Sequence, residues 1–327
     1  MLREGNRKAA DQGYAEAQFN LGVFYERGIG VGRDPVQAIA WYRKAAAQGD
    51  ASAEYSLGLC YETDVGAEKG FSQAFTWYEK SAYHGLAEGQ NNLGTCYMQG
   101  HGVARDPEAG VRWWLKAAEQ GLVFAQFNLA QAYKTGQGVR KDEATAAQWL
   151  RKAADQNSPM AQLNLGVFYL QGIGVATNQI EAVKWFQRAA DQNIPQAQCN
   201  LGICYAKGRG VPRDVASAMK LLQKAAEGGE PNGYNWQAWL LATSPTAELR
   251  DGQKAIEHAE KAVAMTGRKN ATYLVTLAAA YAEGGQFDLA VKTQKEAMAV
   301  LKDETDDRDL ARKLDLYEAH KPFRDAE

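Results

Sequence analysis

Residues 15–50 read AEAQFNLGVFYERGIGVGRDPVQAIAWYRKAAAQGD, and the pattern of this stretch recurs in five further copies that follow without a gap up to Glu230. When each copy is numbered from position 1 to position 36, position 7 is always Leu, position 11 is always Tyr and position 16 is always Gly. Position 27 is Trp in five of the six copies. A fixed period of this length is typical of repeat proteins, in which each unit buries its apolar face against its neighbours. The pattern therefore predicts a stack of like units.

Each copy predicts two helices, because apolar or small residues stand at positions 3, 7, 10 and 11 and again at positions 24, 27, 28, 31 and 32. A residue that can cap the second helix stands at position 20 in five copies: Asp34, Asp106, Asp142, Asn178 and Asp214. Position 35 holds residues that readily adopt the left-handed conformation at a helix end: Gly49, Gly85, Gly121, Asn157, Asn193 and Gly229. Position 8 is Gly in every copy but the fourth, which has Ala130, so a neighbouring helix is expected to lie close to it.

These residues resemble the Sel-1-like repeat, a relative of the tetratricopeptide repeat. The resemblance covers residues 15–230 and rests on segments such as Leu21-Gly22, Gly28-Ile29-Gly30-Val31, Trp41 and Lys44-Ala45-Ala46-Ala47-Gln48-Gly49. It implies an all-α fold, a right-handed α/α superhelical solenoid of antiparallel helix pairs. It also implies an adaptor role in protein–protein interaction, without naming a partner.

The second copy departs from the pattern in the turn between its helices. Asp64 replaces a turn Gly, Ala67 replaces Val, and Gly70-Phe71 replaces the Asp-Pro pair. We expect this turn to differ in conformation, with Ser72 as the cap of the second helix.

The array is flanked by two further segments. Residues 1–14 align with the second half of a copy and predict an N-terminal half-repeat or capping helix, or the end of a longer array. Residues 231–327 depart from the 36-residue register and predict a helical hairpin over 233–243 and 251–266, with Asp251 and Asn270 as helix caps. A tetratricopeptide-like pair over 271–301, an acidic linker over 302–307 and a last amphipathic helix follow. This part resembles the C-terminal segments of bacterial repeat proteins, which implies a solenoid cap; a second binding module is the alternative.

The composition excludes several classes of protein. The 327 residues are 46% hydrophobic and carry a net charge of −2, so no nucleic-acid partner is expected. No stretch reaches the length of about 18 apolar residues that a membrane span needs, so no membrane insertion is expected. The first residues lack an apolar signal region, which indicates a cytoplasmic protein as written. A periplasmic or secreted location stays open if residue 1 is not the native start.

Catalytic chemistry has little support. The four His residues form no metal-binding motif, and the Gly-x-Gly-Val turns follow a helix and lack the spacing of a phosphate-binding loop. We therefore expect no enzyme activity, no catalytic residue, no metal and no cofactor. Cys60, Cys96 and Cys204 stand at position 10, where other copies hold Phe or Ala, so they are expected to be reduced core residues. Position 30 is basic throughout and is expected to be a solvated charge row: Lys44, Lys80, Lys116, Lys152, Arg188 and Lys224.

The candidate binding site lies on the first helix of each copy, which is expected to line the concave face of the solenoid. Position 6 is Asn in five of six copies: Asn20, Asn92, Asn128, Asn164 and Asn200. An amide offers an acceptor and two donors, so this row can pair with the backbone of an extended peptide. Structural bridging between helix pairs is the alternative. The later copies add an apolar patch with a basic edge: Phe124, Phe127, Met160, Leu170, Lys134 and Lys207.

The sequence thus predicts a non-catalytic interaction scaffold that binds an extended peptide or protein segment in its groove. The alternative is a structural or assembly component that docks through its convex face or its ends, as an oligomer or in an envelope complex. The partner is a protein or peptide of unknown identity, and the oligomeric state stays open.

Overall fold

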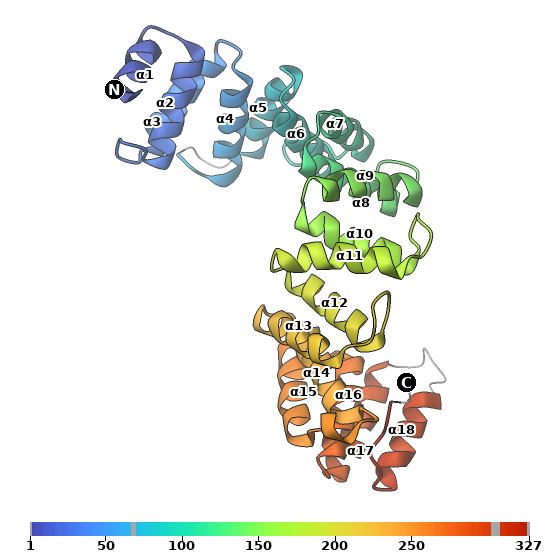
Figure 1. The fold of residues 1–327 in the computed structure, drawn as a ribbon. Coiled ribbons are helices and arrows are strands. Elements are labelled where there is room, and N and C mark those ends of the chain that lie inside the picture. Colours follow the sequence, from blue (N-terminus) through green and yellow to red (C-terminus); the bar gives the residue numbers. More distant parts are fainter. Residues whose placement is uncertain (1, 67–69, 302–307, 326–327) are drawn as a thin grey trace. The chain divides into compact units, whose positions relative to one another are not determined.

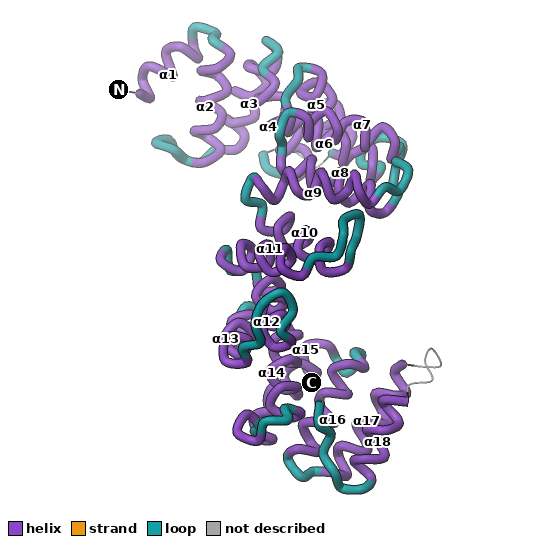
Figure 2. Tube along the Cα trace, turned by 45° about the vertical axis from the view of Figure 1, so that its right-hand side comes forward, coloured by secondary structure: helices purple, strands orange, loops and turns teal. Residues whose placement is uncertain are grey.

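The fold of the chain comes from a computed structural model, which describes residues 2–66, 70–301 and 308–325. These residues form eighteen α-helices and one short 3-10 helix, and they contain no strand (Figures 1 and 2). Consecutive helices pack against one another from α1 to α9 and again from α11 to α18, as in a solenoid of antiparallel helix pairs. The predicted fold class is therefore confirmed.

The chain divides into two compact units. The first contains Met1–Ala161 and Gly172–Ala176, and the second contains Gln162–Gln171 and Thr177–Glu327. The helices that belong wholly to the first unit are α1 (Leu2–Asp11), α2 (Ala15–Arg27), α3 (Pro35–Ala46), α4 (Ala51–Thr63), α5 (Phe71–Tyr83), α6 (Ala87–Gln99), α7 (Pro107–Glu119), α8 (Val123–Thr135) and α9 (Glu143–Asp155). Helix α10 (Pro159–Gln171) has its first residues in the first unit and the rest in the second. The second unit continues with α11 (Gln179–Asp191), α12 (Pro195–Lys207), α13 (Val215–Glu227), α14 (Pro231–Thr243), the 3-10 helix (Ala247–Leu249), α15 (Gly252–Thr266), α16 (Ala271–Glu283), α17 (Phe287–Leu301) and α18 (Arg308–Glu318).

The helix ends follow the capping residues. The side chains predicted as caps each accept a backbone N–H of the first helical turn: Asp34, Asp106, Asp142, Asn178, Asp214, Asp251 and Asn270. All six Gly and Asn residues at position 35 have positive φ, as predicted.

The second copy differs from these expectations. Helix α5 begins after Gly70 without a side-chain cap, so the prediction of Ser72 as the cap is wrong. Asp64 takes the left-handed conformation, with φ 59°, close to the 70° of Gly28, so the turn begins as it does in the first copy. A carboxylate residue tolerates this region better than most non-glycine residues. Ala67 lies outside the described residues.

Within each copy, the second helix packs directly on the backbone of the first. The Leu at position 7 is buried in all six copies, and the Gly at position 8 leaves room for the large side chain at position 28. A Cβ on Gly58 would lie 2.4 Å from Tyr78 Cε1, and one on Gly166 would lie 2.5 Å from Phe186 Cε1. The prediction of a close helix at position 8 is confirmed.

Successive copies are joined by glutamines at positions 4 and 34. Gln48 Nε2 donates to Gln18 Oε1 at 2.9 Å and to the backbone oxygen of Gly13 at 2.8 Å. Gln18 Nε2 donates to the backbone oxygen of Ala10 at 3.2 Å. Because Gln18 is only 6% exposed, its amide is paired as a buried polar group requires. The same glutamine pair recurs in the third, fourth and fifth copies.

The second copy replaces this glutamine pair with Glu54 and His84. Glu54 is 2% exposed, and its Oε2 lies 2.7 Å from Nδ1 of His84. The exchange keeps a hydrogen bond between positions 4 and 34 of the copy while it changes both residues.

The second helices carry a row of stacked cations. Lys44 Nζ lies 3.7 Å from the ring centre of Trp41, and the same arrangement recurs in the next four copies, with Arg188 in the fifth. These five residues are exposed, as expected of a solvated row, but each also stacks on a tryptophan, which was not predicted from the sequence. A cation over an indole face contributes about 0.5–1 kcal/mol at an exposed site.

The 36-residue register extends past Glu230 into α14. Pro231 stands at position 1, as Pro159 and Pro195 do, and α14 has 13 residues like the preceding first helices. Its partner α15 follows after a loop that is one residue longer, with Asp251 as its cap. The hairpin predicted at 233–243 and 251–266 is thus present as α14 and α15. The expected acidic linker over 302–307 lies outside the described residues.

Candidate protein-binding surface

We call the side chains at positions 2, 5, 6, 9, 12 and 13 of the copies the first-helix surface. Its candidate residues are divided between the two units, which are described separately. The first unit holds Asn20, Asn92, Phe124, Phe127, Asn128, Lys134 and Met160. The second unit holds Asn164, Leu170, Asn200 and Lys207. All five asparagines are half-buried.

In the first unit, three asparagines form a hydrogen-bonded chain across two copies. Asn128 Nδ2 donates to Asn91 Oδ1 at 3.1 Å, and Asn91 Nδ2 donates to Asn92 Oδ1 at 3.1 Å. Asn20 has no hydrogen-bond partner for its side chain among the described residues. The structure therefore brings Asn92 and Asn128 into one network, through a residue that the sequence did not single out.

In the first two copies, the carboxylate at position 12 of this surface is paired with a buried tyrosine of the second helix. Tyr42 Oη donates to Glu26 Oε2 at 2.6 Å, and Tyr78 Oη donates to Glu62. Burial and the neighbouring carboxylate raise the pKa of Tyr42, and they do the same to the pKa of Tyr78, where Asn92 acts in the opposite direction. Glu26 and Glu62 thus have partners inside the protein.

The residues of the predicted apolar patch differ in how far they are exposed to solvent. Phe124 is 74% exposed and Met160 is 47% exposed, whereas Phe127 and Lys134 are half-buried. In the second unit, Leu170 packs against the buried cluster that contains Phe186. Phe124 is therefore the most exposed member of the patch, and Leu170 contributes to the core.

Lys207, the last candidate residue along the chain, lies beside an aromatic side chain. Lys207 Nζ lies 4.9 Å from the ring centre of Trp236 on α14. Trp236 was not predicted as a site residue, although it stands at position 6 once the numbering is carried past Glu230. Pro231 at position 1 is the signal that could have shown this. Asn200 has no side-chain hydrogen bond to any described residue.

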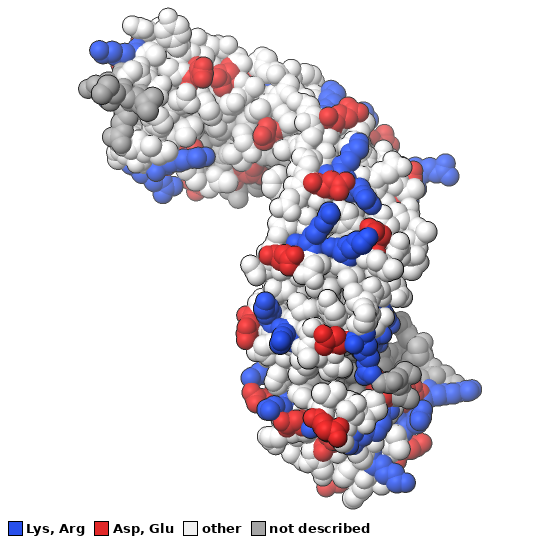
Figure 3. Space-filling model, in the orientation of Figure 1, with Lys and Arg blue, Asp and Glu red and all other residues white. Residues whose placement is uncertain are grey.

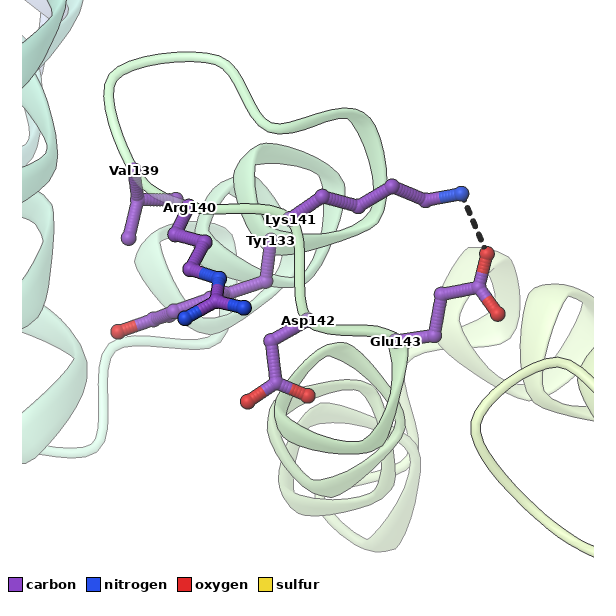
Figure 4. Close-up of a pocket in the computed structure, with 6 residues that line it drawn as sticks. All are labelled: Tyr133, Val139, Arg140, Lys141, Asp142 and Glu143. Atoms are coloured by element: carbon purple, nitrogen blue, oxygen red, sulfur yellow. Dashed lines mark ion pairs between the residues drawn. The ribbon is translucent and has the colours of Figure 1, made fainter.

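A hollow of about 640 Å³ lies at the turn between α8 and α9 (Figure 4). Figure 4 shows Lys141 and Glu143 reaching towards each other, and their charged atoms are 2.7 Å apart. Asp142 caps α9, and hydrogen bonds from Thr145 lower its pKa. The charges of Lys141, Asp142 and Glu143 are therefore paired or used within the loop.

The remaining reactive groups are buried. All four cysteines are free thiols, and burial raises the pKa of Cys60 and Cys204 to about 11 and the pKa of Cys96 and Cys199 to about 12. No group of His, Cys, Asp and Glu in the described chain is arranged to hold a metal. Over the same residues, no helix has the length and apolar character needed to cross a bilayer. Figure 3 shows acidic and basic side chains interspersed on the visible face.

Comparison with known proteins agrees with this architecture. The model of the Sel1 repeat matches residues 15–50, 51–86, 87–122, 123–158, 159–194 and 195–230, and a seventh match covers 247–266 in α15 and the loop before it. Comparison with curated protein sequences gives no match.

Two solved structures are similar over much of their length. A protective antigen of uropathogenic Escherichia coli strains that displays an SLR fold is 30% identical, with a TM-score of 0.84. The match covers 97% of this chain and 68% of the antigen. A Sel1 repeat protein from Oxalobacter formigenes is 28% identical, with a TM-score of 0.63, over 75% of this chain and 96% of that protein. With its repeat motif, its helix pairs and these matches, the chain belongs to the Sel1 repeat family.

Proposed function

We propose that this protein is a non-catalytic scaffold that binds an extended segment of a partner protein on its first-helix surface. Proteins built from Sel1 repeats are generally non-catalytic interaction scaffolds. The proposal adds the binding mode and the residues that carry it.

The observation that supports it is the asparagine chain of the first unit. Asn128 uses one N–H to bind Asn91. An amide has two N–H donors and a carbonyl acceptor, so Asn128 retains one donor and the acceptor, and no described residue pairs with either. A peptide backbone offers one N–H and one C=O per residue, which matches this remaining pair. Each such hydrogen bond contributes about 0.5–1.5 kcal/mol net.

An apolar contact lies beside these groups. Phe124 precedes Asn128 by four residues on α8, so the two side chains share one helix face. The 74% exposure of Phe124 leaves its ring available to an apolar side chain of the segment. Aromatic residues, Phe among them, are enriched in the buried core of protein interfaces.

The test is partner capture from an extract of the source organism by the tagged protein, quantified by mass spectrometry. The variant N92A/N128A should lose its main partner by at least about tenfold, which corresponds to about 1.4 kcal/mol. The matched control is Q37A/Q148A, which removes two exposed amides from second helices of the same unit. Far-UV circular dichroism and urea unfolding verify that both variants fold. Equal capture by the two variants would refute the binding mode.

The second candidate function is docking through the second helices, as a structural or assembly component. The row of cations stacked on tryptophans favours it, because in the first unit it places four large half-buried rings along the second helices: Trp41, Trp77, Trp113 and Trp149. Cross-links confined to second helices, together with capture that does not depend on Asn92 and Asn128, would support this alternative. Light scattering across concentration would show whether a second copy is the partner.

A further inference from the structure

The second unit contains a cleft of about 350 Å³ that is lined by α12, the turn after it and α14. Lys207 comes from the end of α12, and Arg209 and Arg213 come from the turn. Trp236 and Trp239 on α14 are half-buried and also line it. The cleft thus combines cations with two large indole rings.

The charge of the cleft is unbalanced. Asp325 is the one carboxylate among its lining residues, and Asp325 Oδ2 accepts a hydrogen bond from Trp239 Nε1 at 2.8 Å. Neither Lys207 nor Arg209 forms an ion pair within the described residues. Figure 3 shows basic side chains side by side over this part of the second unit. The excess of positive charge contrasts with the net charge of −2 of the whole chain.

Helix α14 already holds an irregular segment of its own chain next to this cleft. Phe323 is 8% exposed, and its ring centre lies 5.8 Å from that of Trp239. The backbone N–H of Asp325 donates to the backbone oxygen of Thr243 at 3.0 Å. An aromatic residue and a carboxylate two positions later are therefore accommodated together on α14, with a backbone hydrogen bond between them and the helix.

We infer that the cleft binds an acidic segment of a partner protein, with its carboxylate side chains on Lys207, Arg209 and Arg213 and an apolar side chain on Trp236. Guanidinium groups bind carboxylates through paired, charge-assisted hydrogen bonds. Tryptophan and arginine are the residue types that most often dominate an interface. The inference rests on the proposed function, because Lys207 belongs to the first-helix surface, and it adds the charge of the segment.

The probe is a dye-labelled short peptide in which Asp and Phe alternate, capped at both ends, and its binding to the full chain is followed by fluorescence anisotropy. A counterpart with Asn in place of Asp should bind at least about tenfold more weakly, and added salt should weaken the acidic peptide. The variant K207Q/R209Q should lose at least about tenfold in affinity for the acidic peptide. The control K220Q/K224Q makes the same charge change at two exposed lysines of α13 and should stay within about twofold.

Three results would overturn the inference: no binding of the acidic peptide, equal binding by K207Q/R209Q and its control, or binding only when the peptide has a free C-terminal carboxylate. Partner capture by N92A/N128A separates this failure from that of the proposed function. If partner capture still depends on those asparagines, the proposed scaffold function stands and only the inference of an acidic segment is refuted. Peptide binding that depends on Lys207 and Arg209, together with partner capture that does not depend on the asparagines, would support the acidic-segment cleft and refute the asparagine binding mode.

Discussion

Replacing Gly58 with Ala should destabilise the protein, although the same change in an open helix is favourable. Ala in place of Gly stabilises a helix interior by up to about 1 kcal/mol. A Cβ at residue 58, however, would lie 2.4 Å from Cε1 and 2.5 Å from Cδ1 of Tyr78. Tyr78 is fully buried, and its hydroxyl is bonded to Glu62, so the ring has no open space to enter. Overpacking of this kind costs about 1–3 kcal/mol, and the expected net loss is about 1–2 kcal/mol.

The fourth copy of the repeat supplies the companion variant. It holds Ala130 at position 8 and Leu150 at position 28, and both are 2% exposed. In a Y78L background, Gly58→Ala should therefore stabilise the protein by up to about 1 kcal/mol. The two measurements form a double-mutant cycle with an expected coupling of about 2–3 kcal/mol.

The assay is urea unfolding followed by circular dichroism, with tryptophan fluorescence to verify a single transition. The variant G5A is the control, because a Cβ at Gly5 in α1 meets no atom within 4 Å and should not destabilise the protein. A G58A variant that is as stable as the wild type, or an equal effect in both backgrounds, would refute the packing argument.

Three further predictions concern the joints and the buried groups. Replacing His84 with Ala should lower the free energy of unfolding, measured in urea, by about 1–3 kcal/mol, because it leaves the buried carboxylate of Glu54 unpaired. The variant E54Q/H84Q should restore stability, because it installs the glutamine pair of the other copies. The change K116Q should lower the free energy of unfolding by about 0.5–1 kcal/mol through loss of the cation over Trp113, while K224Q, whose helix has Leu221 in place of that Trp, should leave it unchanged. Near pH 8 the folded protein should resist iodoacetamide, because the raised pKa values of its thiols keep all but roughly one in a thousand protonated. Mass spectrometry should find alkylation only after unfolding, at Cys60, Cys96, Cys199 and Cys204.

The sequence predicted the features that depend on a single position of the repeat. The caps at position 20, the left-handed residues at position 35 and the close approach at position 8 each follow from the backbone chemistry of one residue type. The Ser72 cap failed because α5 begins at Phe71, two residues earlier than a cap at Ser72 would require, so Ser72 is already helical.

Features that depend on pairs of distant residues could not be derived in this way. The recurrence of Gln at positions 4 and 34 is visible in the sequence, but its meaning appears only in the fold. There Gln18 and Gln48 lie 2.9 Å apart and donate to the backbone oxygens of Ala10 and Gly13 in the preceding segment. The candidate site shows the same limit. Asn92 and Asn128 were identified from their position, whereas the Asn91 that links them occupies a position that is aromatic in the first, second and fourth copies.

The glutamine joints also bear on how such a protein can change over evolutionary time. The joints use positions 4 and 34, where Gln stands in five and in four of the six copies, together with backbone groups of the preceding copy. Position 2, which points to solvent in most copies, varies freely through Glu16, Ser52, Glu88, Phe124, Met160 and Gln196. A duplicated copy would arrive with its joint already complete and could then acquire new exposed side chains without disturbing its neighbours. The array can therefore lengthen, and its binding preference can diverge, as two independent processes.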